Sequence, residues 1–488
     1  MRAPPRHPFD DDKLREECGV FGVIGVEEAA NFVALGLHAL QHRGQEAGGI
    51  VSHHPDHGFN SVRRFGYVRD NFTNASLMQT LPGPLAIGHV RYSTAGSKGA
   101  TAIRDVQPFF GEFSMGGAAL AHNGNLTNAA QLRRELIERG SIFQSSSDSE
   151  CIIHLMARSI QKTIPERMKD ALRRVEGAFS VVAMTRTKLI GVRDALGVRP
   201  LVLGRLAGDG WVLSSETCGL DIIGAEFIRE IEPGEMVVIE HGALQSFRPF
   251  SPATPRPCIF EHVYFSRPDS ILGGRSVYET RRQIGVELAR EAPAEGDLVC
   301  PVPDSGTPAA IGFSQESGIP FAFGIIRNQY VGRTFIEPTE QIRNMGVRLK
   351  LNVNRALVRG KRVVLVDDSV VRGTTSRKIK DMILEAGAAE VHFRIASPPT
   401  AWPCFYGVDT PERAKLLAAN MTEDEMRDWI GVDSLKFVSL DGLYRAAGQP
   451  AGRDPKAPSY CDACFSGQYP VAPSDMIEKG FEMLSAAE

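Results

Sequence analysis

Lys361 to Thr375 read K-R-V-V-L-V-D-D-S-V-V-R-G-T-T, and this stretch decides the fold of the C-terminal half. Its apolar run, residues 363–366, is short and rich in β-branched side chains, which is typical of a buried parallel strand. Asp367 and Asp368 follow at the carboxyl end of that strand, and a turn then leads into a segment with helical periodicity. Ligands of open α/β sheets bind at this edge. The stretch therefore predicts a ligand site at the end of a strand.

The turn after the strand has the composition of a phosphate site. Backbone N–H groups at the start of a helix suit a phosphate, whereas two carboxylates would repel it. The carboxylates could instead bind sugar hydroxyls, or hold a cation between themselves and another anion. A solvated pair of aspartates at a strand end is the alternative. Two aspartates followed by S-x-x-R-G-T-T favour a sugar-phosphate site over that alternative.

The same run resembles the signature of the type I phosphoribosyltransferases, which bind phosphoribosyl pyrophosphate. The resemblance implies that Asp367 and Asp368 hold the ribose hydroxyls and that the following turn holds the 5′-phosphate. The residues of that turn are Ser369, Arg372, Gly373, Thr374 and Thr375. The signature leaves the acceptor of the phosphoribosyl group open.

Bulk properties exclude several classes of protein. With 488 residues the chain is too long for one ordinary core. Apolar residues make up 43% and charged residues 23%, as in soluble globular proteins. A net charge of −3 argues against a nucleic acid or an anionic membrane as partner. The sequence has neither a long apolar run nor a secretory signal, so we expect a cytoplasmic protein. In such a protein, eight cysteines favour metal binding or catalysis over disulfides.

Changes in composition along the chain suggest its domains. Residues 1–17 are charged and contain proline, and we expect them to be disordered. A strand-like apolar run begins at Cys18, and three prolines within residues 251–257 indicate a junction. Beyond it, strands, among them one expected over residues 321–326, alternate with helices, which is βαβ architecture. We therefore predict a leader at 1–17 and domains at 18–250 and 251–488.

Several motifs of the N-terminal half resemble the class II glutamine amidotransferases. They are C-G-V-F-G from Cys18, H-R-G-Q-E from His42, H-V-R-Y-S-T from His89, A-H-N-G-N-L from Ala121, S-S-S-D-S-E from Ser145 and V-R-D-A-L-G-V-R-P-L from Val192. The resemblance covers roughly residues 18–240. It implies the N-terminal-nucleophile fold, in which two stacked sheets lie between helices.

Hydrolysis of the glutamine carboxamide needs a nucleophile, a base and donors for the oxyanion. An ionised thiol is a good nucleophile, and Cys18 is the candidate. If the chain is cut before Cys18, the new α-amino group, with a reference pKa of ~7.7–8.0, suits a general base. The family implies that cut and the removal of residues 1–17. It also implies an oxyanion hole made by Asn123 and the backbone N–H of Gly124.

The resemblance assigns the two ends of the glutamine molecule as well. Arg91 would pair with the α-carboxylate, and Asp148 would bind the α-ammonium group. The alternative for both residues is a structural ion pair. For His42 and Arg43, the choice between a structural role and closure of the site stays open.

In the C-terminal half, V-P-D-S-G-T-P-A-A resembles the pyrophosphate loop of the phosphoribosyltransferases. Its candidate ligand-binding residues are Asp304, Ser305, Gly306 and Thr307. An ordinary turn between a strand and a helix is the alternative. Pyrophosphate as a leaving group calls for Mg²⁺, and the resemblance places one ion per subunit near Ser305, Asp367 and Asp368. The segment from Arg327 to Lys350 resembles the loop that closes over the sugar, with Tyr330 and Arg333 as further contacts.

Two cysteines form C-D-A-C near the C-terminus, at Cys461 and Cys464. Spacing alone leaves a redox pair and half of a zinc site open. One branch of the amidophosphoribosyltransferases carries a leader and a structural [4Fe–4S] cluster, and its cysteine contexts are matched here. The resemblance therefore implies one cluster per subunit, held by Cys258, Cys404, Cys461 and Cys464.

Over nearly its whole length the chain resembles the amidophosphoribosyltransferases. The implied fold is α+β and α/β, with an αββα N-terminal-nucleophile sandwich followed by a type I phosphoribosyltransferase domain. The implied reaction makes 5-phosphoribosylamine from glutamine and phosphoribosyl pyrophosphate, the first committed step of purine synthesis. The family also implies a homotetramer and inhibition by purine nucleotides. Two alternatives are kept: a hexosephosphate aminotransferase, which would lack the run around Asp367, and a non-catalytic nucleotide sensor, which would not need Cys18.

Overall fold

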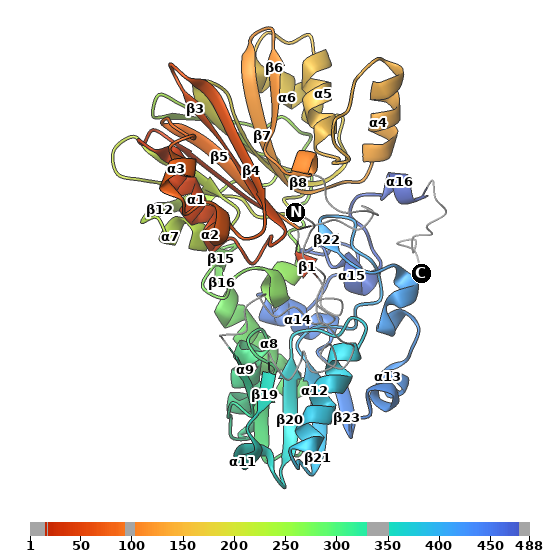
Figure 1. Ribbon diagram of the computed structural model, residues 1–488. Helices are drawn as coiled ribbons and strands as arrows, with labels where there is room; N and C mark the ends of the chain where they lie inside the picture. Colours follow the sequence, from red (N-terminus) through yellow and green to blue (C-terminus); the bar gives the residue numbers. More distant parts are fainter. Residues whose placement is uncertain (1–14, 17, 93–102, 329–350, 478–488) are drawn as a thin grey trace.

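The computed structural model describes residues 15–16, 18–92, 103–328 and 351–477, which fold into two lobes (Figure 1). The upper lobe in that view holds two stacked sheets with helices on both outer faces, and the lower lobe is an α/β unit. The stretch 248–257 between them has no helix or strand, and the predicted boundary between residues 250 and 251 falls inside it.

The first sheet of the upper lobe has seven strands in the order β12-β10-β11-β2-β5-β3-β4. Its strands are β2 Gly19–Ile24, β3 Ala47–His54, β4 Gly58–Phe65, β5 Leu85–Arg91, β10 Val202–Arg205, β11 Trp211–Ser214 and β12 Glu226–Glu230. The second sheet has six strands in the order β14-β13-β9-β8-β7-β6. They are β6 Phe109–Phe113, β7 Gly116–Leu126, β8 Gly177–Met184, β9 Lys188–Arg193, β13 Met236–Glu240 and β14 Ala243–Phe247.

Apolar side chains from both sheets fill the space between them, among them Val20, Ile87 and Val182. Helix α1, Ala29–Ala39, packs on the outer face of the seven-stranded sheet. Three helices cover the six-stranded sheet: α4 Ala129–Glu138, α5 Glu150–Arg158 and α6 Ile164–Leu172. Short helical turns complete the lobe: α2 Val68–Asn71, α3 Ala75–Met78, η1 Ile103–Asp105 and α7 Cys218–Asp221. The layers are therefore αββα, as the sequence predicts.

A parallel sheet of order β17-β20-β21-β23 organises the lower lobe. Its strands are β17 Leu298–Pro301, β20 Arg362–Asp367, β21 Glu390–Ile395 and β23 Ser434–Phe437. Val364 and Val366 of β20 pack under α8 Val277–Glu291 and α9 Thr307–Ser317. Val363 and Leu365 point the other way, toward α12 Thr374–Glu385 and α13 Glu423–Ile430. Both faces of β20 are buried, so its continuous apolar run is the pattern that a parallel strand requires.

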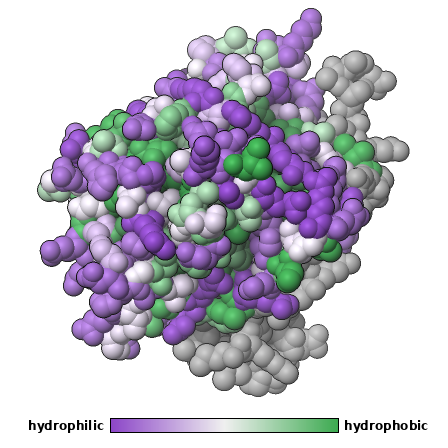
Figure 2. All heavy atoms as spheres, turned by 90° about the horizontal axis from the view of Figure 1, so that it is seen from above, coloured by the Kyte–Doolittle hydropathy of each residue, from purple (hydrophilic) through white to green (hydrophobic). Residues whose placement is uncertain are grey.

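Smaller elements complete the lower lobe and the region between the lobes. They are η2 Glu261–Phe265, β15 Ile271–Leu272, β16 Arg275–Ser276, β18 Ile325–Arg327, β19 Leu351–Val353, α11 Arg355–Val358, β22 Val408–Asp409, η3 Arg413–Lys415, η4 Leu417–Ala419, α14 Leu440–Ala446, α15 Ala463–Ser466 and α16 Ser474–Ile477. Within the described residues, no helix is long and apolar enough to cross a membrane. Seen from above the upper lobe, apolar side chains are scattered among hydrophilic ones (Figure 2).

Two local expectations are wrong. Arg15 and Glu16 form a short strand, β1, which pairs with β22, so these two leader residues are ordered; the rest of the leader lies outside the described residues. A strand expected over residues 321–326 splits in two. Phe321 makes an isolated bridge to Val299, and β18 pairs with β19 outside the main sheet. The chain turns between the two parts at Gly324, where a Cβ would lie 2.8 Å from Sγ of Cys300.

Candidate active sites

Cys18 lies directly before β2 and is buried. Its φ of 62° falls in the left-handed region, which is strained for a residue with a side chain. Gly19 pairs with Val90 of the neighbouring strand β5. Continuing that antiparallel register by one residue places Cys18 beside Arg91, the last residue of β5. The candidate nucleophile and the candidate carboxylate-binding residue therefore share one end of the seven-stranded sheet.

Asp105 connects Arg91 to the segment that carries Asp148. The Arg91 guanidinium donates through Nη1 to the main-chain oxygen of Asp105, at 2.6 Å. Oδ1 of Asp105 accepts from the backbone N–H of Ser146 at 2.8 Å. Ser146 precedes Asp148 by two residues. The two residues predicted to hold opposite ends of glutamine thus belong to one hydrogen-bonded unit.

Asp148 is tied in turn to the strand that carries the candidate oxyanion hole. Its Oδ2 accepts from the backbone N–H of Leu126 at 2.9 Å, at the end of β7. Asn123 of β7 is fully buried, and its side-chain amide has no hydrogen-bond partner among the described residues. Gly124 has a φ of 139°, and a Cβ there would collide with the carbonyl oxygen of Ala178. An unpartnered buried amide beside a backbone that only glycine can adopt is a suitable arrangement for binding a developing oxyanion.

A buried polar layer supports this site, and sequence reasoning assigned it no role. The backbone N–H of His122 donates to Oε1 of Gln107 at 2.7 Å, and its Nδ1 lies 2.8 Å from Oγ of Ser149. Burial lowers the pKa of His122. Burial, with Arg91 and His122 nearby, lowers the pKa of His89 to about 3. Both imidazoles are therefore neutral, and their presence in the H-V-R-Y and A-H-N-G-N-L motifs was the available signal.

Arg43 makes its contacts across the two lobes. Its Nε pairs with Glu216, and its Nη2 lies 2.7 Å from Oε2 of Glu261. Arg199 binds the other oxygen of Glu261 at 3.0 Å, and His42 lies 2.6 Å from Glu216. Burial acts to raise the pKa of Glu216, but Arg43 and His42 outweigh it and hold that pKa below its usual range. These contacts favour a structural role for Arg43, the first of the two possibilities that the sequence leaves open.

The sugar-phosphate edge lies at the carboxyl end of β20. Asp367 and Asp368 are both buried, and Oγ of Ser369 donates to Oδ1 of Asp368 at 2.6 Å. The loop after the neighbouring strand β17 packs against this pair. A Cβ on Gly306 would lie 2.5 Å from the carbonyl oxygen of Val366 and 3.2 Å from Cα of Asp367. The structure therefore brings the two predicted ligand loops of this lobe into direct contact.

Two helices begin at this edge, one after each loop. Helix α9 starts at Thr307, directly after Ser305 and Gly306. Helix α12 starts at Thr374 and continues through Thr375; Gly373 precedes it with a φ of 74°, and a Cβ there would lie 2.6 Å from the Trp429 ring. Backbone N–H groups at two helix N-termini therefore lie at this edge, an arrangement that would suit phosphate groups.

Asp304 and Arg372 differ in how far they are exposed at this edge. Asp304 is exposed, and its Oδ2 lies 2.5 Å from Nη1 of Arg327. Arg372 is half-buried in the turn before α12. Tyr330, Arg333 and Lys350, the predicted contacts of the closing loop, lie outside the described residues.

The four cysteines predicted to hold a cluster come together between the lobes. Cys258 and Cys461 form an isolated parallel bridge, and the Tyr406 N–H points at Sγ of Cys404 at 3.3 Å. Burial raises the pKa of Cys464 well above its usual range, and the thiols of the other three cysteines raise it further. None of the four forms a disulfide. The described residues contain no group of three or more His, Cys, Asp or Glu side chains suited to a single metal ion.

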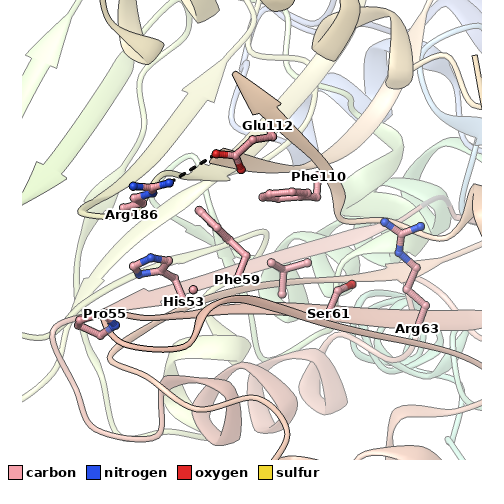
Figure 3. A pocket seen from close by; sticks show the side chains of 10 residues that line it. His53, Pro55, Phe59, Ser61, Arg63, Phe110, Glu112 and Arg186 are labelled. Carbon is pink, nitrogen blue, oxygen red and sulfur yellow. Dashed lines mark hydrogen bonds and ion pairs between the residues drawn. The ribbon is translucent and has the colours of Figure 1, made fainter. Parts of the chain in front are cut away.

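One cavity of about 720 Å³ lies away from these sites, at the open edge of the sandwich between β4 and β6. The rings of Phe59 and Phe110 pack against each other in its lining, and Arg186 pairs with Glu112 beside them (Figure 3). No predicted site residue lines it.

Comparison with known proteins covers both lobes. The glutamine amidotransferase domain family matches residues 94–221. The amidophosphoribosyltransferase of Rhizobium etli is 55% identical over 474 residues, which is 96% of this chain and 94% of that protein. The chloroplastic amidophosphoribosyltransferase of Vigna aconitifolia is 50% identical, over 96% and 94%. The solved structure of glutamine phosphoribosylpyrophosphate amidotransferase from B. subtilis, complexed with ADP and GMP, superposes with a TM-score of 0.87 at 45% identity, over 93% of this chain and 98% of that one.

Proposed function

The chain belongs to the amidophosphoribosyltransferases, and we propose that its two lobes carry the two halves of one reaction. The enzyme takes nitrogen from glutamine and transfers it to phosphoribosyl pyrophosphate, giving 5-phosphoribosylamine, glutamate and pyrophosphate in the first step of purine synthesis. The match over both lobes removes the two alternatives, because neither a hexosephosphate aminotransferase nor a sensor needs both sites.

The upper lobe hydrolyses glutamine. The main observation behind this proposal is a chain of hydrogen bonds. Arg91 is hydrogen-bonded to Asp105, Asp105 to Ser146, and Asp148 to the end of β7. Arg91 and Asp148 hold the α-carboxylate and α-ammonium groups, which directs the carboxamide toward Cys18. The thiolate attacks the carboxamide carbon, and Asn123 and Gly124 donate to the oxyanion. Ammonia leaves, and water then releases glutamate from the thioester.

Removal of residues 1–17 would free the α-amino group of Cys18 as the general base of this step. The backbone supports that proposal. The φ torsion of Cys18, which sits at 62°, exists only while residue 17 is attached. Cutting the chain there removes the torsion and its strain, and it places a base beside the thiol that needs one.

The lower lobe binds phosphoribosyl pyrophosphate. Asp367 and Asp368 hold the ribose hydroxyls, and the turn Ser369–Thr375 holds the 5′-phosphate. The loop 304–307 holds the pyrophosphate with its N–H groups and hydroxyls, while the Asp304 carboxylate is engaged by Arg327. Ser305, Asp367 and Asp368 present the oxygen donors that Mg²⁺ prefers. When bound there, the ion neutralises charge on the leaving pyrophosphate.

Four further properties belong to the proposal. Cys258, Cys404, Cys461 and Cys464 hold one [4Fe–4S] cluster. The support is that two buried and two half-buried thiols belong to one packed cluster of residues, and four cysteine thiolates are its usual donor set. Purine nucleotides inhibit the enzyme, in line with the ADP and GMP bound to the B. subtilis relative. The enzyme is a homotetramer, and it works in the cytoplasm.

Replacing the nucleophile tests the division between the lobes. In Cys18→Ala, synthesis of 5-phosphoribosylamine from glutamine should vanish, while synthesis from added ammonia should remain near the parent rate. Both rates are followed as pyrophosphate release. Glutamine-dependent turnover by the variant would overturn the assignment of Cys18. Equal loss of both rates would show that the two sites cannot be separated in this way.

A further inference from the structure

The chain returns to the upper lobe after the last cluster cysteine. Residues 469–477, here called the strap, leave the lower lobe and end in α16, which lies beside α4 (Figure 1). The strap is anchored where it starts. The Tyr469 hydroxyl donates to the carbonyl oxygen of Pro403 at 2.6 Å, and the Val471 N–H donates to the Tyr406 hydroxyl at 3.0 Å.

At its far end the strap caps helix α4. The Asp475 carboxylate accepts from the backbone N–H groups of Ala130 and Gln131, at 2.6 and 3.1 Å. These are orphan donors of the first helical turn, and a negative charge at that end is favourable. The helix has no cap of its own, because the Asn128 side chain accepts from Glu176 N–H at 3.0 Å and makes no capping bond. The cap is therefore supplied from 345 residues away.

The same residue also holds the turn between β7 and α4. The Asp475 N–H donates to the carbonyl oxygen of Thr127 at 2.9 Å. Beside it, Oγ of Ser474 donates to Oε2 of Glu176 at 2.8 Å, and Glu176 accepts the Thr127 N–H through its main-chain oxygen. The strap is therefore hydrogen-bonded to the turn on both its helix side and its strand side.

That turn follows directly on the oxyanion residues. Leu126, one residue before Thr127, donates its N–H to Asp148, and Gly124 and Asn123 lie two and three residues further back on β7. Movement of the turn would shift both the oxyanion donors and the carboxylate that meets the substrate ammonium group. Misplacing such groups by a small distance is costly for catalysis.

We propose that Asp475 is a positioning residue for glutamine hydrolysis, acting through the N-terminus of α4 and Thr127 on Asn123, Gly124 and Asp148. The inference rests on the proposed function, since it needs β7 to carry the oxyanion hole. It adds a requirement that the upper lobe alone does not meet: the glutamine site is completed by the C-terminal strap.

The test compares Asp475→Ala and Asp475→Asn with the parent enzyme. Thr163→Ala is the matched control, because Thr163 caps α6 in the same layer through Glu166 N–H, a bond that involves no residue of the turn. For Asp475→Ala we expect kcat/KM for glutamine to fall by about tenfold, less than the loss of an oxyanion donor. The ammonia-dependent rate should stay at the parent value. Asp475→Asn, which keeps an oxygen acceptor, should recover part of the loss.

The rate at which a glutamine-like alkylating agent labels Cys18 provides a second readout. It should fall with kcat/KM in both Asp475 variants and stay unchanged in Thr163→Ala. A parallel fall of the glutamine- and ammonia-dependent rates, or unchanged kinetics, would reduce Asp475 to a structural cap and overturn the proposal. If Asp475→Ala does not fold, Asp475→Asn alone decides. Cys18→Ala is measured alongside. If that variant kept its glutamine-dependent activity, the proposed function itself would be refuted, and not only the role of Asp475.

Discussion

The glutamine end of the upper lobe and the sugar-phosphate edge of the lower lobe are built in opposite ways. At the glutamine end, bonds such as Arg91 to Asp105 and Asp148 to Leu126 join residues 14 and 22 positions apart, and the strap adds one that spans 345. At the sugar-phosphate edge, Ser369 bonds its neighbour Asp368. The second site is therefore contained in short motifs, whereas the first depends on the arrangement of the whole lobe.

This difference predicts how far a disturbance travels. A change in a strand-turn-helix motif should damage its own ligand site and leave the other lobe working. A change at the glutamine end should also leave the sugar-phosphate edge working. Changes in the contacts between the lobes, unlike changes in a ligand motif, can reach the glutamine end. They act through Arg43 and the strap, both of which cross between the lobes. Variants at the two sites can therefore break or sharpen the comparison.

The largest effect should come from the double variant Asp367→Asn/Asp368→Asn. Each lost charge weakens hydrogen bonds to ribose hydroxyls, at about 1.5–3 kcal/mol for each bond. Two such losses correspond to about 10²- to 10⁴-fold in kcat/KM for phosphoribosyl pyrophosphate. Synthesis from glutamine and from ammonia should fall together, while basal glutamine hydrolysis, measured as glutamate release, should persist. If glutamate release disappears as well, the lower site is not self-contained and the comparison fails.

A smaller effect is expected for Asn123→Ala. The variant removes one oxyanion donor, and such a loss costs about 10²–10³ in kcat. The glutamine-dependent rate should fall by that factor with little change in KM, and the ammonia-dependent rate should stay at the parent value. Thr187→Ala, an exposed change on the β8–β9 turn, is the control. An equal fall of the ammonia-dependent rate would mean that Asn123 supports the fold and not the oxyanion.

The contrast also explains what the sequence could predict. The site around Asp367 could be predicted because its strand, turn and helix are contiguous in the sequence. The structure places the loop at Gly306 against the end of this strand, while the predicted contacts within residues 329–350 lie outside the described residues. For the glutamine end, the family motifs contain the candidate residues. The motifs do not contain Asp105, which links Arg91 to Asp148. Its local sequence resembles that of any loop aspartate, so no local signal pointed to it.

Long-range partners were out of reach for a physical reason. Glu261 and Arg43 are 218 residues apart, and Asp475 lies in a Pro-containing segment with no pattern of its own. Only the packing of the two lobes gives these side chains their partners. The hairpin of β3 and β4 was also missed. Its polar and glycine residues hide the alternation, because β4 is an edge strand with one exposed face.

The smallest effect should be seen in the pH dependence of stability at the glutamine end. Burial, helped by Arg91 and His122, lowers the pKa of His89 to about 3, below the value of about 6.5 for an exposed histidine. Between those two values the unfolded chain binds a proton that the folded chain does not, so stability falls as the pH drops through this window. One proton contributes a slope of about 1.4 kcal/mol for each pH unit. In His89→Gln that slope should be absent from urea unfolding curves compared at several pH values, while His241→Gln, an exposed control, should keep it. An unchanged slope in His89→Gln would mean that water reaches this histidine, and that the glutamine end is not closed by the packing of the whole lobe.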